Sequence, residues 1–557
     1  MNKISAGDII ADVLAQHGIK YLFGLPGGHI YPMMEACEER GIKFIGTRHE
    51  MNAAFMAEGW ALATAEIGLC TGTAGPGFTN LLTGIANSFA GRIPVICIAG
   101  KAAINEQDQN ALQDFNQIDM IKPITKYART ILDIRRIPEF IGRAIAEAVS
   151  DCPGPVYIEI PKDVMESSVN PEEVKVQKKY VATSKPCGNP EDIKKAIELI
   201  NKAERPIIVA GSGVWWSKAV PLLREFAEIS QIPVFTRNAG RGAVPDDHPL
   251  GMGIAASRHP VFRMAAQASD VVLLFGTRPN YILTPDVFPE SCKIIRVDIR
   301  AAELRNLLDA DLAIHGDCGQ VLRQLISGVK EKDRSGWIEG IRRIRQLIEK
   351  ALEPLMLSDK VPINPLRLCY EVSNFIKKDT IVVIDGGDTA LFGNFVLPAL
   401  EAGQYLSIAG TNFGPLGVGV PYAMAAKLAH PDKEVLLLTG DGAFGYGIME
   451  YETAVRYGIN FTAVVLNDAC WGMIMRSEAK KRLRENFVGL KLSEVRYDKI
   501  VEALGGHGDL VTEPDEIGNA IREAMTSNKP AVVNVMTDPS IGFVNLEEYL
   551  MRKLSGG

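Results

Sequence analysis

Strand-like apolar runs alternate with helix-like segments along almost all of this 557-residue chain. Such alternation is typical of α/β domains built on parallel sheets. One run, residues 435–438, leads through a single threonine into Gly440, Asp441 and Gly442. The carboxyl ends of parallel strands form the edge at which open α/β sheets bind ligands. The sequence therefore favours parallel sheets and places an acidic side chain at a ligand-binding edge.

The chain is too long for one hydrophobic core, and two polar segments divide it. Residues 166–189 are interpreted as a first linker. The charged, helix-prone residues 330–350, with residues 358–362, are interpreted as a second one. We therefore expect three α/β domains of similar size with parallel sheets. Their predicted bounds are residues 1–170, 190–330 and 358–545, the last with a C-terminal helical tail.

The composition argues against several classes of function. A net charge of −7 disfavours nucleic acid as a partner. No apolar run is long enough to span a membrane, and the first residues lack the apolar core of a signal peptide. The nine cysteines include no CxxC pair, which favours buried thiols in a reducing compartment. A cytoplasmic enzyme is the expectation.

A second oxygen ligand is expected beside Asp441. Residues 461–466 form another strand-like run, and Asn467 and Asp468 follow it. Because parallel strands end at the same edge, oxygen ligands should converge there from two neighbouring strands. Such oxygens suit Mg²⁺, which also binds diphosphate. The spacing resembles the thiamine diphosphate signature Gly-Asp-Gly…Asn-Asn, with Asp468 in place of the second Asn. This aspartate could tighten metal binding or repel the phosphates.

The first domain carries a candidate catalytic acid, Glu50, just after the strand-like residues 43–46. Thiamine diphosphate needs a carboxyl group against its pyrimidine N1′, so that its 4′-amino group can take the thiazolium C2 proton. A pocket that excludes water shifts the pKa of such a carboxyl group. On the residue alone, a solvated or N-capping acid is the competing interpretation. Downstream, Gly75 lies in a Gly-rich turn whose backbone can approach a planar ring closely.

Together these motifs resemble the acetohydroxyacid synthase, pyruvate oxidase and benzaldehyde lyase superfamily over essentially the whole chain. The resemblance implies pyrimidine-binding, central and diphosphate-binding domains of the thiamine diphosphate-binding fold. It also implies that each cofactor spans two subunits of a homodimer or homotetramer. By this resemblance, Glu50 activates N1′, while Asp441, Asp468 and the carbonyl of Cys470 hold Mg²⁺. The implied cofactor-binding residues are Gly28, Gly75, Gly387, Asp388, Thr389, Pro415, Leu416, Gly440, Asp441, Gly442, Ala443, Asp468, Trp471, Gly472 and Met473.

Other positions bear on the substrate. His29 and Gln113, with Glu50, match the catalytic set of benzaldehyde lyase, the closest resemblance in active-site motifs. A structural histidine and a surface-loop glutamine are the alternatives. Tyr281 and Ile282 stand where acetohydroxyacid synthases carry an acidic-basic pair, and the missing cation would normally grip the carboxylate of the acceptor. No motif indicates FAD, which stays an open alternative for the central domain.

We therefore predict a thiamine diphosphate- and Mg²⁺-dependent carbon–carbon lyase or carboligase with a small-molecule carbonyl substrate. It would make or cleave 2-hydroxyketones of the acyloin or benzoin type from aldehydes or 2-oxo acids. An acetolactate synthase-type enzyme and a 2-hydroxyacyl-CoA lyase are the alternatives within the superfamily. A non-catalytic cofactor-binding protein is the alternative of another class. The amphipathic residues 545–552 are expected to form a packing helix or a lid.

Overall fold

The computed structural model describes residues 3–407, 411–482 and 487–554. The chain folds into two compact units. Unit 1 consists of Met1–Ser184, Thr411–His430 and Met449–Ile459, and unit 2 of Lys185–Gly410, Pro431–Ile448 and Asn460–Gly557. The units contain three six-stranded sheets in which all neighbouring strands are parallel. The predicted α/β class with parallel sheets is confirmed.

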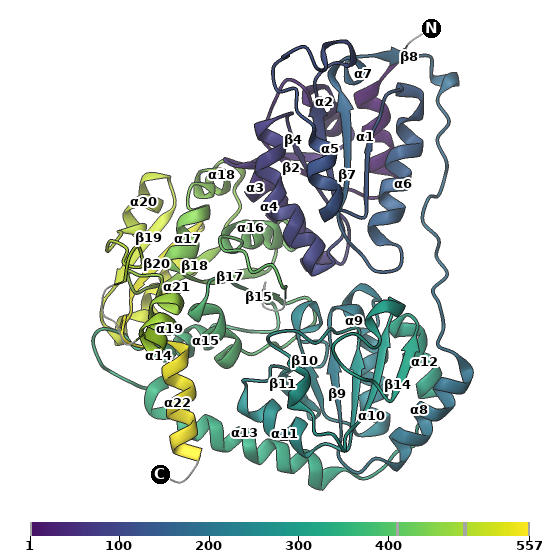
Figure 1. Ribbon diagram of the computed structural model, residues 1–557. Coiled ribbons are helices and arrows are strands. Elements are labelled where there is room, and N and C mark those ends of the chain that lie inside the picture. Colours follow the sequence, from purple (N-terminus) through teal and green to yellow (C-terminus); the bar gives the residue numbers. More distant parts are fainter. Residues whose placement is uncertain (1–2, 408–410, 483–486, 555–557) are drawn as a thin grey trace. The chain divides into compact units, whose positions relative to one another are not determined.

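Unit 1 contains one of these sheets, with the strand order β3-β2-β4-β5-β7-β6. In Figure 1, helices α1 and α6 cover one face of it, and α3 and α4 cover the other. The strands are β2 (Tyr21–Gly24), β3 (Lys43–Gly46), β4 (Gly68–Gly72), β5 (Val95–Lys101), β6 (Tyr127–Thr130) and β7 (Val156–Pro161). A short antiparallel pair, β1 (Ile4–Ser5) with β8 (Ser168–Val169), lies outside the sheet. The helices are α1 (Ala6–Gln16), α2 (Tyr31–Glu39), α3 (Glu50–Thr64), α4 (Pro76–Gly91), α5 (Gln117–Ile121), α6 (Ile137–Val149), α7 (Lys162–Met165), α16 (Gly419–Ala429) and α18 (Glu450–Tyr457).

Helix α3 is buried around most of its circumference, because α4, α16 and β4 all pack against it. The contact with α16 is close at Gly59, where a Cβ would lie 3.0 Å from the Cα of Tyr422. Beside it, Glu58 is fully buried and accepts a hydrogen bond of 2.6 Å from Asn87 Nδ2. Burial raises the pKa of Glu58 to about 8.

The first sheet of unit 2 has the strand order β11-β10-β9-β12-β13-β14. In chain order this is 3-2-1-4-5-6, the doubly wound order of dinucleotide-binding folds. Its strands are β9 (Pro206–Ala210), β10 (Val234–Thr236), β11 (Gly251–Ile254), β12 (Val271–Phe275), β13 (Lys293–Asp298) and β14 (Leu312–His315). The helices around it are α8 (Pro190–Lys202), α9 (Ser212–Trp216), α10 (Val220–Ser230), α11 (Pro260–Ala268), α12 (Cys318–Ile326) and α13 (Ser335–Met356).

The second sheet of unit 2 has the strand order β16-β15-β17-β18-β20-β19. In chain order this is 2-1-3-4-6-5, the same order as the sheet of unit 1. Its strands are β15 (Thr380–Ile384), β16 (Tyr405–Ser407), β17 (Glu434–Gly440), β18 (Thr462–Asn467), β19 (His507–Val511) and β20 (Ala531–Met536). Its helices are α14 (Pro365–Ser373), α15 (Asp388–Val396), α17 (Asp441–Gly447), α19 (Gly472–Arg482), α20 (Tyr497–Ala503), α21 (Ile517–Thr526) and α22 (Phe543–Leu554).

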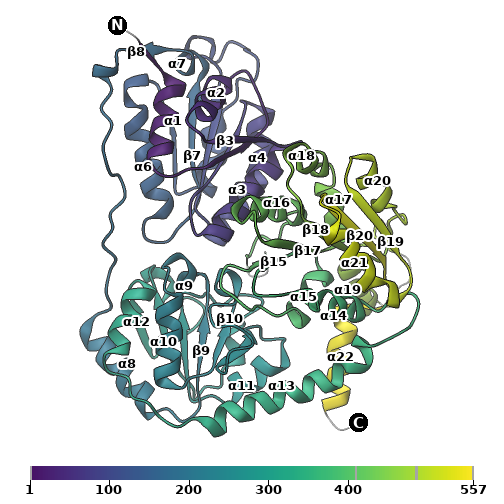
Figure 2. The ribbon, with the colours of Figure 1, turned by 180° about the vertical axis from the view of Figure 1, so that it is seen from behind.

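Two segments that the sequence assigned to a linker and to a C-terminal tail are helices packed on the core of unit 2. Helix α13 covers much of the predicted second linker and buries Ile341 and Ile348. The C-terminal α22 lies against α13 (Figure 2). It buries Leu546 and Leu550, and Tyr549 donates a hydrogen bond to the α13 backbone. This contact favours the packing-helix interpretation of the tail. Within the described residues, no helix has both the length and the apolar character needed to cross a membrane.

The buried Glu58 predicts a pH-dependent stability. Its folded-state pKa of about 8 lies above the ordinary value of 4.5, so its contribution is fully present below about pH 4.5 and is lost as the pH rises through 8. The loss is on the order of a few kcal/mol. We expect Glu58→Gln to flatten the fall of the melting temperature between pH 5 and pH 8.5, measured by scanning calorimetry. The exposed Glu66→Gln serves as the control, and equal pH profiles for both variants would contradict the prediction.

Candidate active site

Glu50 lies at the carboxyl edge of the unit 1 sheet, as the first residue of α3. Its side chain is buried, with 5% of the residue exposed. Asn80 Nδ2 donates a hydrogen bond of 2.9 Å to Glu50 Oε2. The other oxygen, Oε1, faces Gly77, where a Cβ would lie 3.3 Å away. One carboxylate oxygen is therefore fixed by α4, while the other lies beside a residue without a side chain.

His29 and Gln113 meet through a residue that the sequence analysis did not single out. His29 Nδ1 lies 3.0 Å from Thr73 Oγ1, and Thr73 Oγ1 lies 3.3 Å from Gln113 Oε1. His29 follows β2 and Thr73 follows β4, two adjacent strands between which the strand order reverses. This switch point is the usual ligand-binding position of such sheets. Burial lowers the pKa of His29, and the cation of Lys162 lowers it further, which favours the neutral imidazole.

The loop that carries Gln113 is held by Gln117 at the start of α5. Gln117 Oε1 accepts a hydrogen bond of 2.9 Å from the Gly75 backbone N–H, and its Nε2 donates 2.9 Å to the carbonyl oxygen of Gly100. Gly75 has a φ of +61° and faces Gln113, whose Cβ would lie 3.0 Å from a Cβ at Gly75. A side chain at Gly75 is therefore excluded by both backbone conformation and space.

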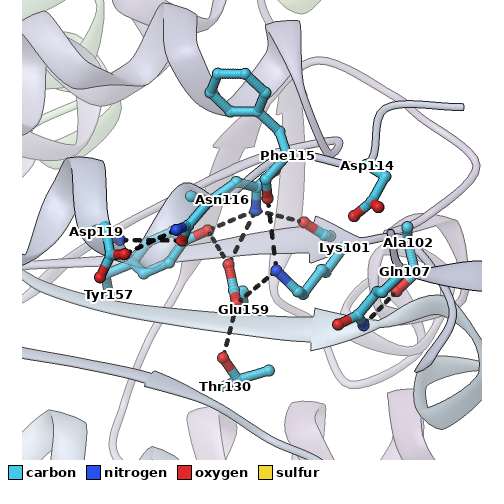
Figure 3. Close-up of polar contacts among 12 residues, drawn as sticks. Lys101, Ala102, Gln107, Asp114, Phe115, Asn116, Asp119, Thr130, Tyr157 and Glu159 are labelled. Atoms are coloured by element: carbon cyan, nitrogen blue, oxygen red, sulfur yellow. Dashed lines mark hydrogen bonds and ion pairs between the residues drawn. The ribbon is translucent and has the colours of Figure 1, made fainter. Parts of the chain in front are cut away.

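Gln117 Nε2 also donates a hydrogen bond of 3.1 Å to Glu159 Oε2. Glu159 is the centre of a buried polar network with Thr130, Tyr157 and Lys101 (Figure 3). Glu159 is fully buried and accepts hydrogen bonds from Thr130 Oγ1 at 2.7 Å and Tyr157 Oη at 3.2 Å. Lys101 Nζ lies 3.3 Å from the Glu159 carboxylate and also donates to the carbonyl oxygen of Phe115, in the Gln113 loop. The network therefore ties this loop to β5, β6 and β7.

Unit 2 brings the predicted metal ligands together at the carboxyl ends of β17 and β18. Asp441 accepts a 2.8 Å hydrogen bond from the Gly442 N–H and further ones from Ala469 and Cys470. Burial raises the pKa of Asp441 to about 7, and the negative charge of Asp468 adds to the rise. A divalent cation would relieve this repulsion. The donor set of two carboxylates and a backbone carbonyl consists of hard oxygens and therefore fits Mg²⁺.

Three of the predicted cofactor-binding glycines allow side chains to pack closely around this site. A Cβ at Gly440 would lie 2.9 Å from Thr389 Oγ1, and one at Gly387 would lie 3.1 Å from Met473 Cβ. A Cβ at Gly442 would lie 2.5 Å from the Trp471 ring. Residues from α15, α17 and α19 therefore converge on one edge of the sheet.

The remaining predicted residues lie as follows. Gly28 is in the loop after β2, with open space where a Cβ would be. Pro415 is buried and Leu416 half-buried, both within unit 1. Ala443 is buried in α17. Asp388, Asp468 and Gly472 all contact Arg476. Within the described residues, no cluster of three or more His, Cys, Asp or Glu side chains that could hold a metal is found.

Sequence reasoning missed Thr73, Gln117 and Arg476. Thr73 had a local signal, because it directly follows a strand-like run in the Gly-rich turn. Gln117 and Arg476 had none: Gln117 contacts residues 42 positions away, and Arg476 contacts Asp388 at a separation of 88. Only the fold joins such partners.

Comparison with known proteins identifies the family. Three models of thiamine pyrophosphate enzymes match in order: the N-terminal TPP binding domain at residues 4–120, the central domain at 193–325 and the C-terminal TPP binding domain at 385–535. The chain belongs to the thiamine pyrophosphate enzyme family. It is therefore a lyase or carboligase that depends on thiamine diphosphate. The family order agrees with the three sheets of the structure.

Similar proteins cover nearly the whole of this thiamine pyrophosphate enzyme. The acetolactate synthase large subunit IlvG of Mycobacterium tuberculosis is 33% identical over 97% of this chain and 96% of its own. A probable acetolactate synthase large subunit of Methanocaldococcus jannaschii is 33% identical over 96% of this chain and 92% of its own. Human 2-hydroxyacyl-CoA lyase 2 is 31% identical over 95% of this chain and 89% of its own.

The Gln117 contacts generate a prediction about the Gly75 turn. Gln117→Leu keeps the approximate size but removes the side-chain acceptor of the Gly75 N–H and three other buried hydrogen bonds, at about 1–3 kcal/mol for a buried polar group left unsatisfied. We expect faster hydrogen exchange of the peptide covering residues 73–78 and a lower urea midpoint. Gln107→Leu, which removes one hydrogen bond to Ala102, is the control. Equal exchange in the two variants would show that Gln117 does not hold the turn.

Proposed function

We propose that this enzyme makes or cleaves 2-hydroxyketones of the acyloin or benzoin type, starting from aldehydes or 2-oxo acids, and that it requires Mg²⁺. The observation that carries the proposal is the hydrogen-bonded chain His29–Thr73–Gln113 beside the buried Glu50. When bound, thiamine diphosphate supplies a nucleophilic carbon, its thiazolium C2, that attacks a carbonyl group. The residues of the protein then decide which proton moves and which substrate enters.

In this proposal, Glu50 holds a proton at the pyrimidine N1′. Its Oε1 is the oxygen suited to this contact, because Oε2 already accepts from Asn80. His29 moves a proton to and from the substrate oxygen, and its lowered pKa favours the neutral form that can act first as a base. Gln113 donates a hydrogen bond to the substrate carbonyl through its Nε2, since its Oε1 faces Thr73.

Asp441 and Asp468 would hold Mg²⁺ with the Cys470 carbonyl, and the glycines at 387, 440 and 442 would let the cofactor approach the backbone. The raised pKa of Asp441 supports this assignment, because burial and the charge of Asp468 disfavour its carboxylate, and a bound cation would offset both effects. Two carboxylates are typical of sites in which Mg²⁺ shares its coordination with phosphate.

We also propose that two subunits build each active site. The loop that carries Gln113 exposes apolar side chains beside it: Leu112 is 81% exposed and Phe115 is 50% exposed. A second subunit covering this loop would remove apolar surface from water. The expected state is a homodimer or a homotetramer.

The names of the relatives point to two other substrates, pyruvate and 2-hydroxyacyl-CoA. Purified enzyme should therefore be given benzoin, an acyloin, pyruvate and a 2-hydroxyacyl-CoA in parallel, with products measured by mass spectrometry. Turnover of benzoin or the acyloin above the others supports our proposal. Acetolactate as the main product would replace it with a synthase function, and cleavage of the thioester substrate would replace it with a CoA-lyase function.

Glu50→Gln tests the proposed role of Glu50. The amide cannot share a proton with N1′, so exchange of the C2 hydrogen of bound thiamine diphosphate should fall by at least 100-fold. Exchange into deuterated water, followed by NMR after acid quench, measures this rate. Glu66→Gln, at an exposed position just after the end of α3, should exchange at the wild-type rate. Wild-type exchange in Glu50→Gln would remove Glu50 from the mechanism.

His29→Ala separates catalysis from cofactor binding. Loss of a general acid–base group should lower kcat by about 10²–10⁴-fold. The Kd of thiamine diphosphate should change little, because the proposal places His29 at the substrate. Thr73→Val, which removes the hydroxyl contacts to His29 Nδ1 and Gln113 Oε1 but keeps the imidazole, should give a smaller loss. A parallel loss of kcat and cofactor affinity in His29→Ala would indicate a structural histidine.

A further inference from the structure

Arg476 lies between two of the acidic side chains of the unit 2 site. Its Nη2 is 2.8 Å from Asp388 Oδ2 and 2.9 Å from Asp468 Oδ2, and its Nε is 3.0 Å from Asp388 Oδ2. Its Nη1 donates to the Pro539 carbonyl oxygen at 2.7 Å. The three side chains are nearly buried, with exposures of 11%, 11% and 14% for Arg476, Asp388 and Asp468. The guanidinium is therefore fixed on both sides.

Two glycines make the space that the guanidinium fills. A Cβ at Gly472 would lie 1.9 Å from Arg476 Nη2, and a Cβ at Gly542 would lie 2.3 Å from Arg476 Nε. Gly472 is one helical turn before Arg476 on α19, whereas Gly542 precedes α22. Neither glycine has a positive φ, so their role here is space rather than backbone conformation.

The contact explains how an aspartate can stand where the cofactor signature has an asparagine. An asparagine offers one acceptor oxygen and one donor nitrogen, whereas an aspartate offers two acceptors. In this chain Oδ1 of Asp468 accepts from the Cys470 N–H at 3.3 Å, and Oδ2 accepts from Arg476. Arg476 therefore supplies the donor that the second oxygen needs, while Oδ1 makes no contact with the guanidinium and accepts from the backbone.

The charges of these side chains support the same role for Arg476. Asp388, Asp441 and Asp468 carry three negative charges near the place proposed for a diphosphate and its metal. A guanidinium paired with two of them reduces this to a net charge of −2, which one divalent cation balances. Without Arg476, an extra negative charge would face the diphosphate at low dielectric, where such repulsion is strong.

We propose that Arg476 is a positioning residue that makes Asp468 a one-oxygen metal ligand and offsets its charge, so that the site accepts a diphosphate. The inference rests on the proposed Mg²⁺ site of Asp441 and Asp468. It predicts that Arg476 and Asp468 are energetically coupled in cofactor binding, whereas Asp388 mainly anchors the guanidinium to α15.

The full-length protein is first stripped of metal and cofactor, and Mg²⁺ is then added back to saturation. The test measures the Kd of thiamine diphosphate for this protein. Calorimetry and tryptophan fluorescence both report it, since Trp471 packs on Gly442. We expect Arg476→Met to raise the Kd at least tenfold. Adding Asp468→Asn to Arg476→Met should lower the Kd again by at least fivefold. Adding Asp388→Asn to Arg476→Met instead should restore the melting temperature more than the affinity for thiamine diphosphate. Arg367→Met is the matched control, because Arg367 is 13% exposed and also pairs with two carboxylates.

The outcomes distinguish this inference from the proposed metal site. Asp441→Ala should abolish Mg²⁺-dependent binding, and unchanged binding in that variant would remove the site itself. If Asp441→Ala does abolish binding while Arg476→Met binds like the wild type, Arg476 has no such role. If Asp388→Asn rather than Asp468→Asn restores cofactor affinity in the Arg476→Met variant, Arg476 is a packing residue and the proposal is overturned. If Arg476→Met does not fold, Arg476→Lys takes its place, with a Kd at least threefold above wild type expected and a wild-type Kd contradicting us.

Discussion

Parallel pairing of β17 with β15 on one side and β18 on the other is the constraint on which the unit 2 site depends. It brings three strand ends to one edge, so that the residues after each strand become neighbours. Arg476 pairs with Asp388 after β15 and with Asp468 after β18. The proposed metal joins Asp468 to Asp441 after β17. These aspartates are far apart in the sequence. The sheet of unit 1 uses the same strand order, and its switch point holds His29 and Thr73.

Glycine has a common role in both constellations. At Gly75, Gly77 and Gly100 in unit 1, a Cβ would meet Gln113, Glu50 or His29 at 3.3 Å or less. At Gly442, Gly472 and Gly542 in unit 2, it would meet Trp471 or Arg476. The sites are therefore crowded by large functional side chains, and the missing Cβ atoms are what lets those side chains reach their partners.

The buried polar groups form networks in which most members have partners, which is the condition for burying charge at moderate cost. Glu159 is surrounded by Thr130, Tyr157, Gln117 and Lys101, and Arg476 by two carboxylates and a carbonyl oxygen. Asp441 is the contrast: backbone N–H groups hold it, yet its pKa is raised by burial and by Asp468. The residue whose carboxylate is disfavoured by its surroundings is therefore the one proposed to bind metal.

The sequence by itself determined the α/β class, several strand positions and the cofactor, because apolar runs and the Gly-Asp-Gly spacing are local patterns. The run at 43–46 coincides with β3, the run at 435–438 falls within β17, and the run at 461–466 overlaps β18. It also named Glu50, His29 and Gln113, although their roles stay predictions. Only the tertiary structure decided that Thr73 joins His29 to Gln113 and that Arg476 joins Asp388 to Asp468. These contacts depend on which strand ends lie side by side, and no local pattern encodes that.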